Sequence, residues 1–335
     1  MKTKFLSVSL SLILVISTLC GCSDTKDSNS LTKVTLNEVA HSLFYAPQYV
    51  AIENGYFEEE GIELNLVTGF GADKTMAAVL AGEADIGFMG SESSIYVYSG
   101  ETTDHIVNFA QLTQRAGNFL VARENMENFS FDMLKGKEIL GGRKGGMPEM
   151  VFEYILKKNG VNPTELNINQ SIDFGSTAAA FSGGQGDFTV EFEPSATLLE
   201  ENQTGYVVAS LGVESGYVPY TAYSAKQSYI ENHPDILLAF TKALQKGLNY
   251  VNSHSSEEIA TIISPQFTDT NYDTMVTIIN RYKAQQTWKS DLIFSQESFD
   301  LLQNILDEAG ELCERVPYSE LVNTQIATTA FQEVQ

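Results

Sequence analysis

Residues 77–92, AAVLAGEADIGFMGSE, hold the end of a predicted helix, a glycine turn, an aspartate and an apolar strand, in that order. Residues 179–194, AAFSGGQGDFTVEFEP, align with them without gaps and start 102 residues later, at position 179 against 77. A repeated helix–turn–strand unit predicts two similar α/β lobes, although a match this short can also arise by chance.

The chain around these units alternates short strands with amphipathic helices. Strands are predicted at residues 34–40, 62–69 and 85–90, and helices at 45–57, closed by Gly55, and at 72–84. The same rhythm returns with a strand at 137–142, a helix at 147–158 and a strand at 187–193. Strands separated by helices of about 10–15 residues are typical of βαβ units and predict an α/β fold with parallel sheets.

After residue 223 the pattern becomes helical. Residues 233–254 have Pro234 at a plausible first helical position and an apolar stripe of period 3.6, formed by Leu237, Phe240, Leu244, Leu248 and Val251. This stripe predicts a helix whose apolar face packs into the core of the protein. Further helices are predicted at 269–283 and 297–307, and together they form a helical tail that we expect to pack on one lobe.

Composition and charge narrow the class of protein. The 335 residues suffice for two domains of ordinary size, and 43% of them are hydrophobic, which predicts a globular chain with a sizeable core. The formal charge of −23 argues against nucleic-acid binding, because that requires a basic surface. An acidic surface does not by itself identify a ligand.

The first 22 residues carry a targeting signal. Lys2 and Lys4 precede an apolar run at 5–19 that is too short to span a bilayer, and the run ends in LCGC at 19–22. This ending resembles the lipobox of bacterial lipoproteins and predicts a signal peptide at 1–21 and lipidation of Cys22. Residues 22–33 would then be a lipid anchor and flexible linker that hold an extracytoplasmic domain to the membrane. A plain secretory signal cleaved nearby is the alternative.

Cysteine and histidine usage predicts neither a metal site nor a disulfide framework. After cleavage only Cys22 and Cys313 remain, and Cys313 has no partner in the sequence. The four histidines show no spacing typical of zinc ligands, and no cofactor is expected.

Several motifs identify a resemblance. Residues 41–67, HSLFYAPQYVAIENGYFEEEGIELNLV, are similar to the opening of the nitrate/sulfonate/taurine-binding and thiamine-pyrimidine-binding family of solute-binding proteins of ABC importers. Further matches are LAGEADIGFMGSES (80–93), LKGKEILGGRKGGMPEM (134–150), GGQGDFTVEFEPSA (183–196) and YSAKQSYIENHPDILLAFTKAL (223–244). The five motifs follow the family's order over most of residues 34–255.

The resemblance implies a periplasmic-binding-protein type II fold, in which two α/β lobes joined by two hinge strands enclose a ligand. The first lobe would comprise 34–118 and 222–335, the second 119–221, and the hinges would fall near 117–123 and 217–223. The helical tail would return to the first lobe. Capture of a small molecule, closure of the lobes and docking on a permease with its ATPase subunits would be the function.

In open α/β sheets ligands bind at the carboxyl ends of the strands, so the segments that follow strands supply the candidates. His41, Phe44 and Tyr45 offer stacking surface and one imidazole, with core packing as the alternative for each aromatic ring. Ser91 and Glu92 offer a donor and an acceptor; the alternative is a helix cap, with Ser91 at the N-cap and Glu92 in the first turn.

The glycine-rich turn at 141–150 is the third candidate segment. Free amides at the start of a helix attract anions, and Arg143 and Lys144 would add positive charge. The candidates Gly145, Gly146 and Met147 stand where related sulfonate binders often have hydroxyl residues, which counts against a sulfonate. A purely structural turn is the alternative.

The strand at 187–193 places two acids, Glu191 and Glu193, on one face. Buried carboxylates are costly unless paired or hydrogen-bonded, so a position beside a ligand explains them. Glu191 is favoured over Glu193, which precedes Pro194 and is expected to be partly exposed. The alternative is an internal pair with Arg115 or Arg143. Arg115 and Tyr220 complete the candidate ligand-binding set.

Two classes of ligand and one enzymatic alternative follow. An aromatic or heterocyclic metabolite, such as a thiamine-precursor pyrimidine, suits the aromatic rings and the acids and is favoured; a sulfonate, taurine or nitrate would use the amides and Arg143. Enzymes that synthesise the thiamine pyrimidine share the fold and carry Lys and His after the third strand. Residues 85–93, DIGFMGSES, have neither, so no catalytic residue is expected.

Overall fold

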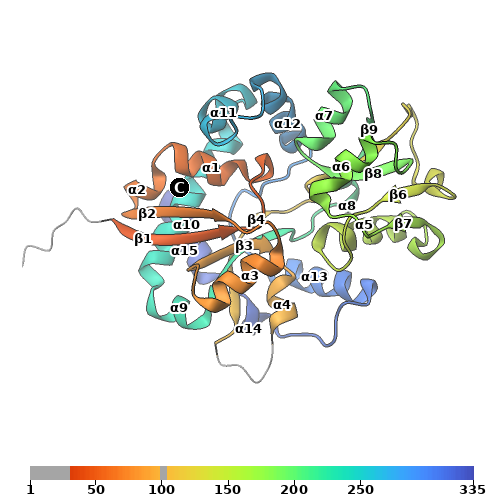
Figure 1. Cartoon of the computed structure of the whole chain (residues 1–335). Coiled ribbons are helices and arrows are strands. Elements are labelled where there is room, and N and C mark those ends of the chain that lie inside the picture. The colour runs from red at the N-terminus through yellow and green to blue at the C-terminus, as the bar shows by residue number, and fades with distance from the viewer. Residues whose placement is uncertain (1–30, 99–103) are drawn as a thin grey trace, which may run out of the picture. The chain divides into compact units, whose positions relative to one another are not determined.

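The computed structural model describes residues 31–98 and 104–335 (Figure 1). The predicted signal peptide, Cys22 and most of the predicted linker lie outside the described residues. Residues 31–335 form one compact unit that contains two five-stranded sheets. Among the helices described, none has both the length and the apolar character needed to cross a bilayer.

The first sheet has the strand order β2-β1-β3-β10-β4. Its strands are β1 (Thr32–Glu38), β2 (Ile62–Thr68), β3 (Ile86–Gly90), β4 (Ile106–Thr113) and β10 (Thr221–Lys226). β1 runs parallel to β2 and β3, while β10 runs antiparallel to β3 and β4. The carboxyl ends of β1, β2 and β3 therefore meet at one edge.

The second sheet has the order β7-β6-β8-β5-β9. Its strands are β5 (Asn118–Ala122), β6 (Glu138–Leu140), β7 (Asn167–Asn169), β8 (Phe188–Phe192) and β9 (Tyr206–Ser210). β6 is parallel to β7 and β8, and β5 pairs antiparallel with β8 and β9. Two similar sheets agree with the repeat of the helix–turn–strand unit, but each sheet is mixed and not purely parallel as predicted, because β10 and β5 run antiparallel to their neighbours.

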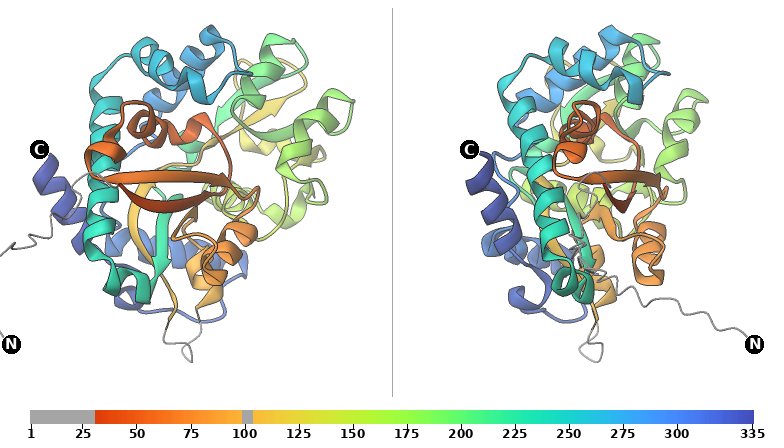
Figure 2. Two further views of the ribbon diagram at one scale, coloured as in Figure 1. Left: turned by 60° about the vertical axis from the view of Figure 1, so that its left-hand side comes forward. Right: turned by 90° about the vertical axis from the view of Figure 1, so that its left-hand side faces the viewer.

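Helices cover both sheets (Figures 1 and 2). Those before β10 are α1 (Ala46–Glu53), α2 (Tyr56–Glu59), α3 (Ala72–Ala81), α4 (Ser93–Val97), α5 (Met147–Lys158), α6 (Phe174–Ser182), α7 (Ser195–Glu201) and α8 (Leu211–Ser215). Those after it are α9 (Gln227–Asn232), α10 (Pro234–Ser253), α11 (Ser256–Ile263), α12 (Tyr272–Ala284), α13 (Gln296–Ala309), α14 (Tyr318–Leu321) and α15 (Gln325–Val334). Short 3-10 turns span η1 (Leu43–Tyr45), η2 (Phe131–Leu134), η3 (Pro163–Glu165) and η4 (Ser264–Gln266).

Two segments carry the chain from one sheet to the other. The first, 114–117, follows β4, and the second, 211–220, follows β9 and includes α8. They lie side by side, because Val218 N donates to Gln114 O at 2.9 Å. The hinges predicted near 117–123 and 217–223 overlap these segments and also strands, since 118–122 is β5 of the second sheet and 221–226 is β10 of the first.

The helical tail contacts both sheets and not one, which corrects the expectation from the sequence. α10 packs against α1 and α15 beside the first sheet, and Figure 2 shows α10 and α15 side by side. Further along, however, α12 contacts α7 and α13 contacts α5, two helices that belong with the second sheet. The stripe on α10 is packing, as predicted, since Leu237, Phe240 and Leu244 are fully buried.

Candidate functional site

The end of β3 projects a buried carboxylate toward the second sheet. Glu92 follows the strand and precedes α4, and its side chain forms no cap hydrogen bond there. Instead its Oε1 accepts a hydrogen bond from Met147 N, the first residue of α5, at 3.3 Å. Glu92 is 3% exposed, and its Oε2 has no partner within the described residues. Burial raises the pKa of this carboxyl to about 7, because removing a charge from water disfavours the ionised form.

Ser91 has another role than the predicted cap. Its hydroxyl donates to the carbonyl of Pro219, in the second crossing segment, and α4 starts two residues later without a serine side-chain cap. The hydroxyl therefore ties the end of β3 to the segment that carries Tyr220. Ser91 N also donates to Tyr220 O, at 3.4 Å.

The glycine-rich turn lies directly in front of α5, which begins at Met147 as predicted. Gly145 has φ +82°, a conformation that L side chains rarely adopt, so this position requires glycine. Gly145 N donates to Glu149 Oε2 at 3.1 Å, and Gly145 O accepts from the Tyr96 hydroxyl at 2.9 Å. The amides before α5 are thus bound by carboxylates on both sides, Glu149 from its own helix and Glu92 from the first sheet.

The cations of the turn are paired at the surface. Arg143 lies 3.9 Å from Asp73, and Lys144 lies 3.6 Å from Glu311, each cation with a mostly exposed side chain. Such exposed pairs contribute little free energy, but they show that neither cation neutralises Glu92.

Phe44 is the centre of an aromatic cluster between the two sheets. Its ring lies 5.6 Å from that of Tyr220, nearly perpendicular to it, and 6.4 Å from that of Phe192 at the end of β8. A Cβ on Gly117 would lie 2.6 Å from the Phe44 ring, so glycine at the crossing lets the ring approach the backbone. Tyr45 packs on Phe88 at 4.4 Å. Both readings of these aromatics, stacking surface and packing, are compatible with this cluster.

Asn118 is a site residue that the sequence did not indicate. It is 1% exposed, and neither its Nδ2 nor its Oδ1 has a partner among the described residues. It opposes Phe192 in the β5–β8 ladder, so both side chains lie on the same face of the second sheet, the face that meets Phe44. An asparagine in a short apolar strand, NFLVA, is the signal that could have revealed it.

Tyr220 adds a third buried polar group to this region. It is 3% exposed, and its hydroxyl has no partner in the described part of the chain. Burial raises its pKa well above the ordinary value, and the proximity of Tyr45 and Glu92 adds to the effect. A carboxylate oxygen of Glu92, the amide of Asn118 and the phenol of Tyr220 are therefore all buried and lack a hydrogen-bond partner among the described residues. Buried polar groups are nearly always satisfied, so each of these groups is a candidate for a contact with water or with another molecule.

The two acids of β8 have different surroundings. Glu191 is 1% exposed and accepts from Thr189 Oγ1 at 2.5 Å and from Thr177 of α6. It lies on the face of the sheet opposite to Asn118, since neighbouring strand residues alternate. Burial raises its pKa to about 7.

Glu193 is tied up internally. It is 3% exposed, not partly exposed as expected, and it accepts from Arg281 Nη1, Thr197 N and Thr197 Oγ1, each at 2.9 Å. The internal ion pair that was considered for the acids thus exists, but its arginine is Arg281 of α12 and neither Arg115 nor Arg143. A tail residue was not expected beside the second sheet.

Two further candidates lie in other surroundings. His41 bonds Glu38 Oε1 at 2.8 Å and Gln266 O at 2.9 Å, and these contacts raise its pKa. Arg115 lies over the ring of Tyr217 at 4.4 Å and donates to Gly212 O at 3.0 Å. His41 thus joins the end of β1 to the tail, and Arg115 joins the two crossing segments to each other.

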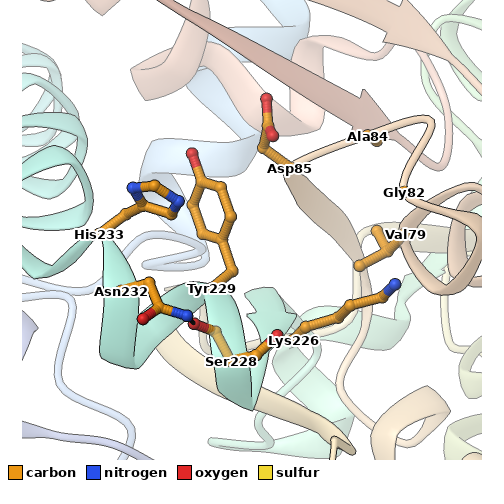
Figure 3. Close-up of a pocket in the computed structure, with 9 residues that line it drawn as sticks. All are labelled: Val79, Gly82, Ala84, Asp85, Lys226, Ser228, Tyr229, Asn232 and His233. Carbon is orange, nitrogen blue, oxygen red and sulfur yellow. Dashed lines mark hydrogen bonds between the residues drawn. The ribbon is translucent and has the colours of Figure 1, made fainter.

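A small pocket lies elsewhere in the first sheet (Figure 3). It has a volume of about 160 Å³ and is lined by Asp85, Lys226, Ser228, Tyr229 and His233, among others. Asp85 precedes β3 and Glu92 follows it, so this pocket is at the opposite end of the strand from the Phe44 region. In the described residues no group of three or more His, Cys, Asp or Glu side chains could hold a metal ion.

Known proteins resemble this chain in sequence and in fold. The family model described as NMT1/THI5 like matches residues 44–258. YtlA of Bacillus subtilis (strain 168) is 47% identical over 309 residues, which cover 92% of this chain and 92% of YtlA. The chain belongs to the NMT1/THI5-like family.

Solved structures show the fold of this family member. The alkanesulfonate-binding protein SsuA from Xanthomonas axonopodis pv. citri, bound to MOPS, has a TM-score of 0.71 at 14% identity, over 88% of this chain and 98% of that one. The desulfurization enzyme DSZB has a TM-score of 0.65 at 12% identity, over 91% of this chain and all of that one. The fold is the periplasmic-binding-protein type II fold, as the resemblance implied, and it carries both binding proteins and an enzyme.

Proposed function

We propose that this protein is the extracytoplasmic solute-binding component of an ABC importer, which delivers a small organic molecule to a permease and its ATPase subunits. The observation that carries the proposal is a set of buried groups without a hydrogen-bond partner in the described part of the chain: Glu92 Oε2, the Asn118 amide and the Tyr220 hydroxyl, whose ring packs against Phe44. The name of YtlA, which provisionally designates it a binding protein, supports the same class of function.

Ligand capture would couple to movement of two lobes, residues 34–118 with 222–335 and residues 119–221. Glu92 and Phe44 come from the first sheet's loops, Met147 belongs with the second sheet, and Asn118, the first residue of β5, stands at the boundary between the two lobes. A ligand that contacts both groups would stabilise the arrangement in which they are close, and this differential affinity is what hinge closure requires. Lipidation of Cys22, proposed from residues 19–22 alone, would hold the protein at the membrane.

The chemistry of the groups favours an aromatic or heterocyclic ligand that donates hydrogen bonds. The Glu92 carboxylate can accept a hydrogen bond from the ligand. The Asn118 amide and the Tyr220 phenol can each donate and accept hydrogen bonds. Phe44 supplies a ring for stacking. A thiamine-precursor pyrimidine has this combination of features, whereas a sulfonate, taurine or nitrate would need donors and positive charge where a carboxylate lies.

Binding is favoured over catalysis because of what the set contains. Glu92, Asn118 and Tyr220 provide hydrogen bonds, but no lysine, cysteine or histidine of the described chain joins them as a nucleophile or base. His41 is held by Glu38 and by the backbone of Gln266.

A thermal-shift panel tests the proposal on the purified chain. Aminopyrimidines and flavins form one group of compounds, and taurine, alkanesulfonates and nitrate form the other. We expect the melting temperature to rise with a member of the first group and not to change with the second. Stabilisation by sulfonates or nitrate alone would overturn the favoured ligand class, and turnover of any compound would overturn the assignment as a binding protein.

A further inference from the structure

Helix α5 presents an anion-binding end to the region between the sheets. It has 12 residues, and the N–H group of its first residue, Met147, has no backbone partner within the helix, so this end carries partial positive charge toward that region. In many proteins such an end holds a phosphate, sulfate or carboxylate of a ligand. Here the protein's own carboxylates hold it: Glu92 Oε1 at Met147 N and Glu149 Oε2 at Gly145 N.

Glu92 reaches this position because β3 ends in glycine. A Cβ at Gly90 would lie 2.2 Å and 2.5 Å from the two carboxylate oxygens of Glu92, so any side chain there would push the carboxylate away. The carboxylate folds back over Gly90 toward α5, and its Oε2 finds no hydrogen-bond partner among residues 31–98 and 104–335.

The charge of Glu92 has no cation beside it. The ion pairs of the described residues include none with Glu92, and the nearby cations of the turn, Arg143 and Lys144, are exposed and paired with Asp73 and Glu311. An anionic ligand at the start of α5 would therefore meet a buried negative charge in a medium of low dielectric, where like charges repel strongly.

We propose that Glu92 determines the charge specificity of the ligand site: its carboxylate occupies the anion-binding end of α5, rejects anionic ligands, and offers Oε2 to a hydrogen-bond-donating or cationic group. This inference rests on the proposed function, because it assigns a selective role within the same site. On this inference, the single residue Glu92 makes this protein select a different ligand charge from an anion-binding protein of the same fold.

The substitution Glu92→Gln tests the assignment with little change in shape. Glutamine can still accept from Met147 N through its side-chain oxygen, but it removes the charge and presents an NH₂ group in place of Oε2. The probe is ethanesulfonate, titrated calorimetrically at about pH 8. We expect Glu92→Gln to bind ethanesulfonate at least tenfold more tightly than the wild type does.

Glu63→Gln is the matched control, because Glu63 is an exposed acid of β2 that pairs with Lys33 at 3.4 Å, so its loss changes net charge equally. It should bind ethanesulfonate as the wild type does. Circular dichroism checks the fold of each variant, and Glu92→Ser, which removes the carboxylate in another way, replaces the Gln variant if that one does not fold.

Two results would overturn the inference: ethanesulfonate binding by the wild type as tight as by Glu92→Gln, or no binding by either protein. A failure of the proposed function has a different signature, since it would leave the wild type without response to every compound of the panel, whatever Glu92→Gln binds.

Discussion

The ends of β3 and β8 begin as the same local unit and differ in how they treat an acid. After β3, Glu92 is buried with one oxygen at the start of α5 and the other without a partner among the described residues. At the end of β8, Glu193 is equally buried, but Arg281 and both polar groups of Thr197 bind it. The comparison teaches that a buried carboxylate with a full set of partners needs no ligand, whereas one whose oxygen lacks a partner among the described residues can accept a hydrogen bond from a ligand.

The largest loss of stability should come from removing Glu193, the buried carboxylate that has a full set of partners. Glu193→Ala leaves Arg281 with Glu200 and Thr197 Oγ1 as partners and removes the acceptor of Thr197 N, so we expect the free energy of unfolding to fall by about 3–5 kcal/mol. Urea denaturation measures this loss. Glu200→Ala, which removes the more exposed partner of the same arginine, should cost about 1 kcal/mol. Equal losses in the two variants would show that Glu193 is not the buried anchor of this network.

The contribution of Glu92, after β3, to the free energy of unfolding should depend on pH. The pKa of Glu92 is raised to about 7, so the folded protein prefers the protonated form. Its contribution to the free energy of unfolding is therefore fully present below about pH 4.5, falls as pH rises, and is lowest above about pH 7, a change of about 3 kcal/mol.

Urea denaturation of the wild type and of Glu92→Gln across this pH range isolates the contribution of Glu92. Burial also raises the pKa values of Glu149 and Glu191, but these two groups titrate in both proteins, so their effects cancel in the difference. The stability difference should shift in favour of Glu92→Gln with increasing pH. A difference that is constant from pH 4 to 8 would contradict the prediction.

The smallest change in stability should come from Asn118. Asn118→Leu removes two buried groups without partners, so we expect the unfolding free energy to rise by about 1 kcal/mol while affinity for the panel ligand falls at least tenfold. Asn108→Leu is the matched control, since the Asn108 amide donates to Ser94 Oγ at 2.8 Å and to Leu321 O at 3.3 Å. It should lose about 1–3 kcal/mol. Destabilisation of the same size in both variants would mean that Asn118 has a structural partner.

Local pattern was enough for most of the fold. The helix starting at Met147, the glycine that closes α1, and the parallel strands of the first sheet follow from periodicity and turn residues, which act over a few positions. The crossing points were less well predicted because a strand has the same alternation in either sheet. The contact of the tail with the second sheet depends on side chains far apart in the sequence, such as Arg281 and Glu193, and no local pattern encodes such a pair.

Local pattern and chain order also indicated some residues of the candidate site. Phe44, Glu92 and Met147 became candidates because they follow strands or open a helix, positions that chain order alone reveals. Asn118 was missed because it sits inside an apolar strand, and only the absence of a hydrogen-bond partner distinguishes it. Glu193 is the opposite case. Its place at the end of a strand made it a candidate for ligand contact, but its partner is Arg281 of the tail.

The end of α12 limits the ways in which the molecule can open. Tyr282 and Gln285 donate to the carbonyl oxygens of Gly117 and Ala116, each at 3.0 Å, and Gln114 N donates to Thr287 O at 2.9 Å. Three chain segments thus share one small hydrogen-bonded junction between the sheets. Two connections alone would permit both bending and twisting, but a third contact beside them adds torsional stiffness, so we expect a single bending mode with its axis near Gly117.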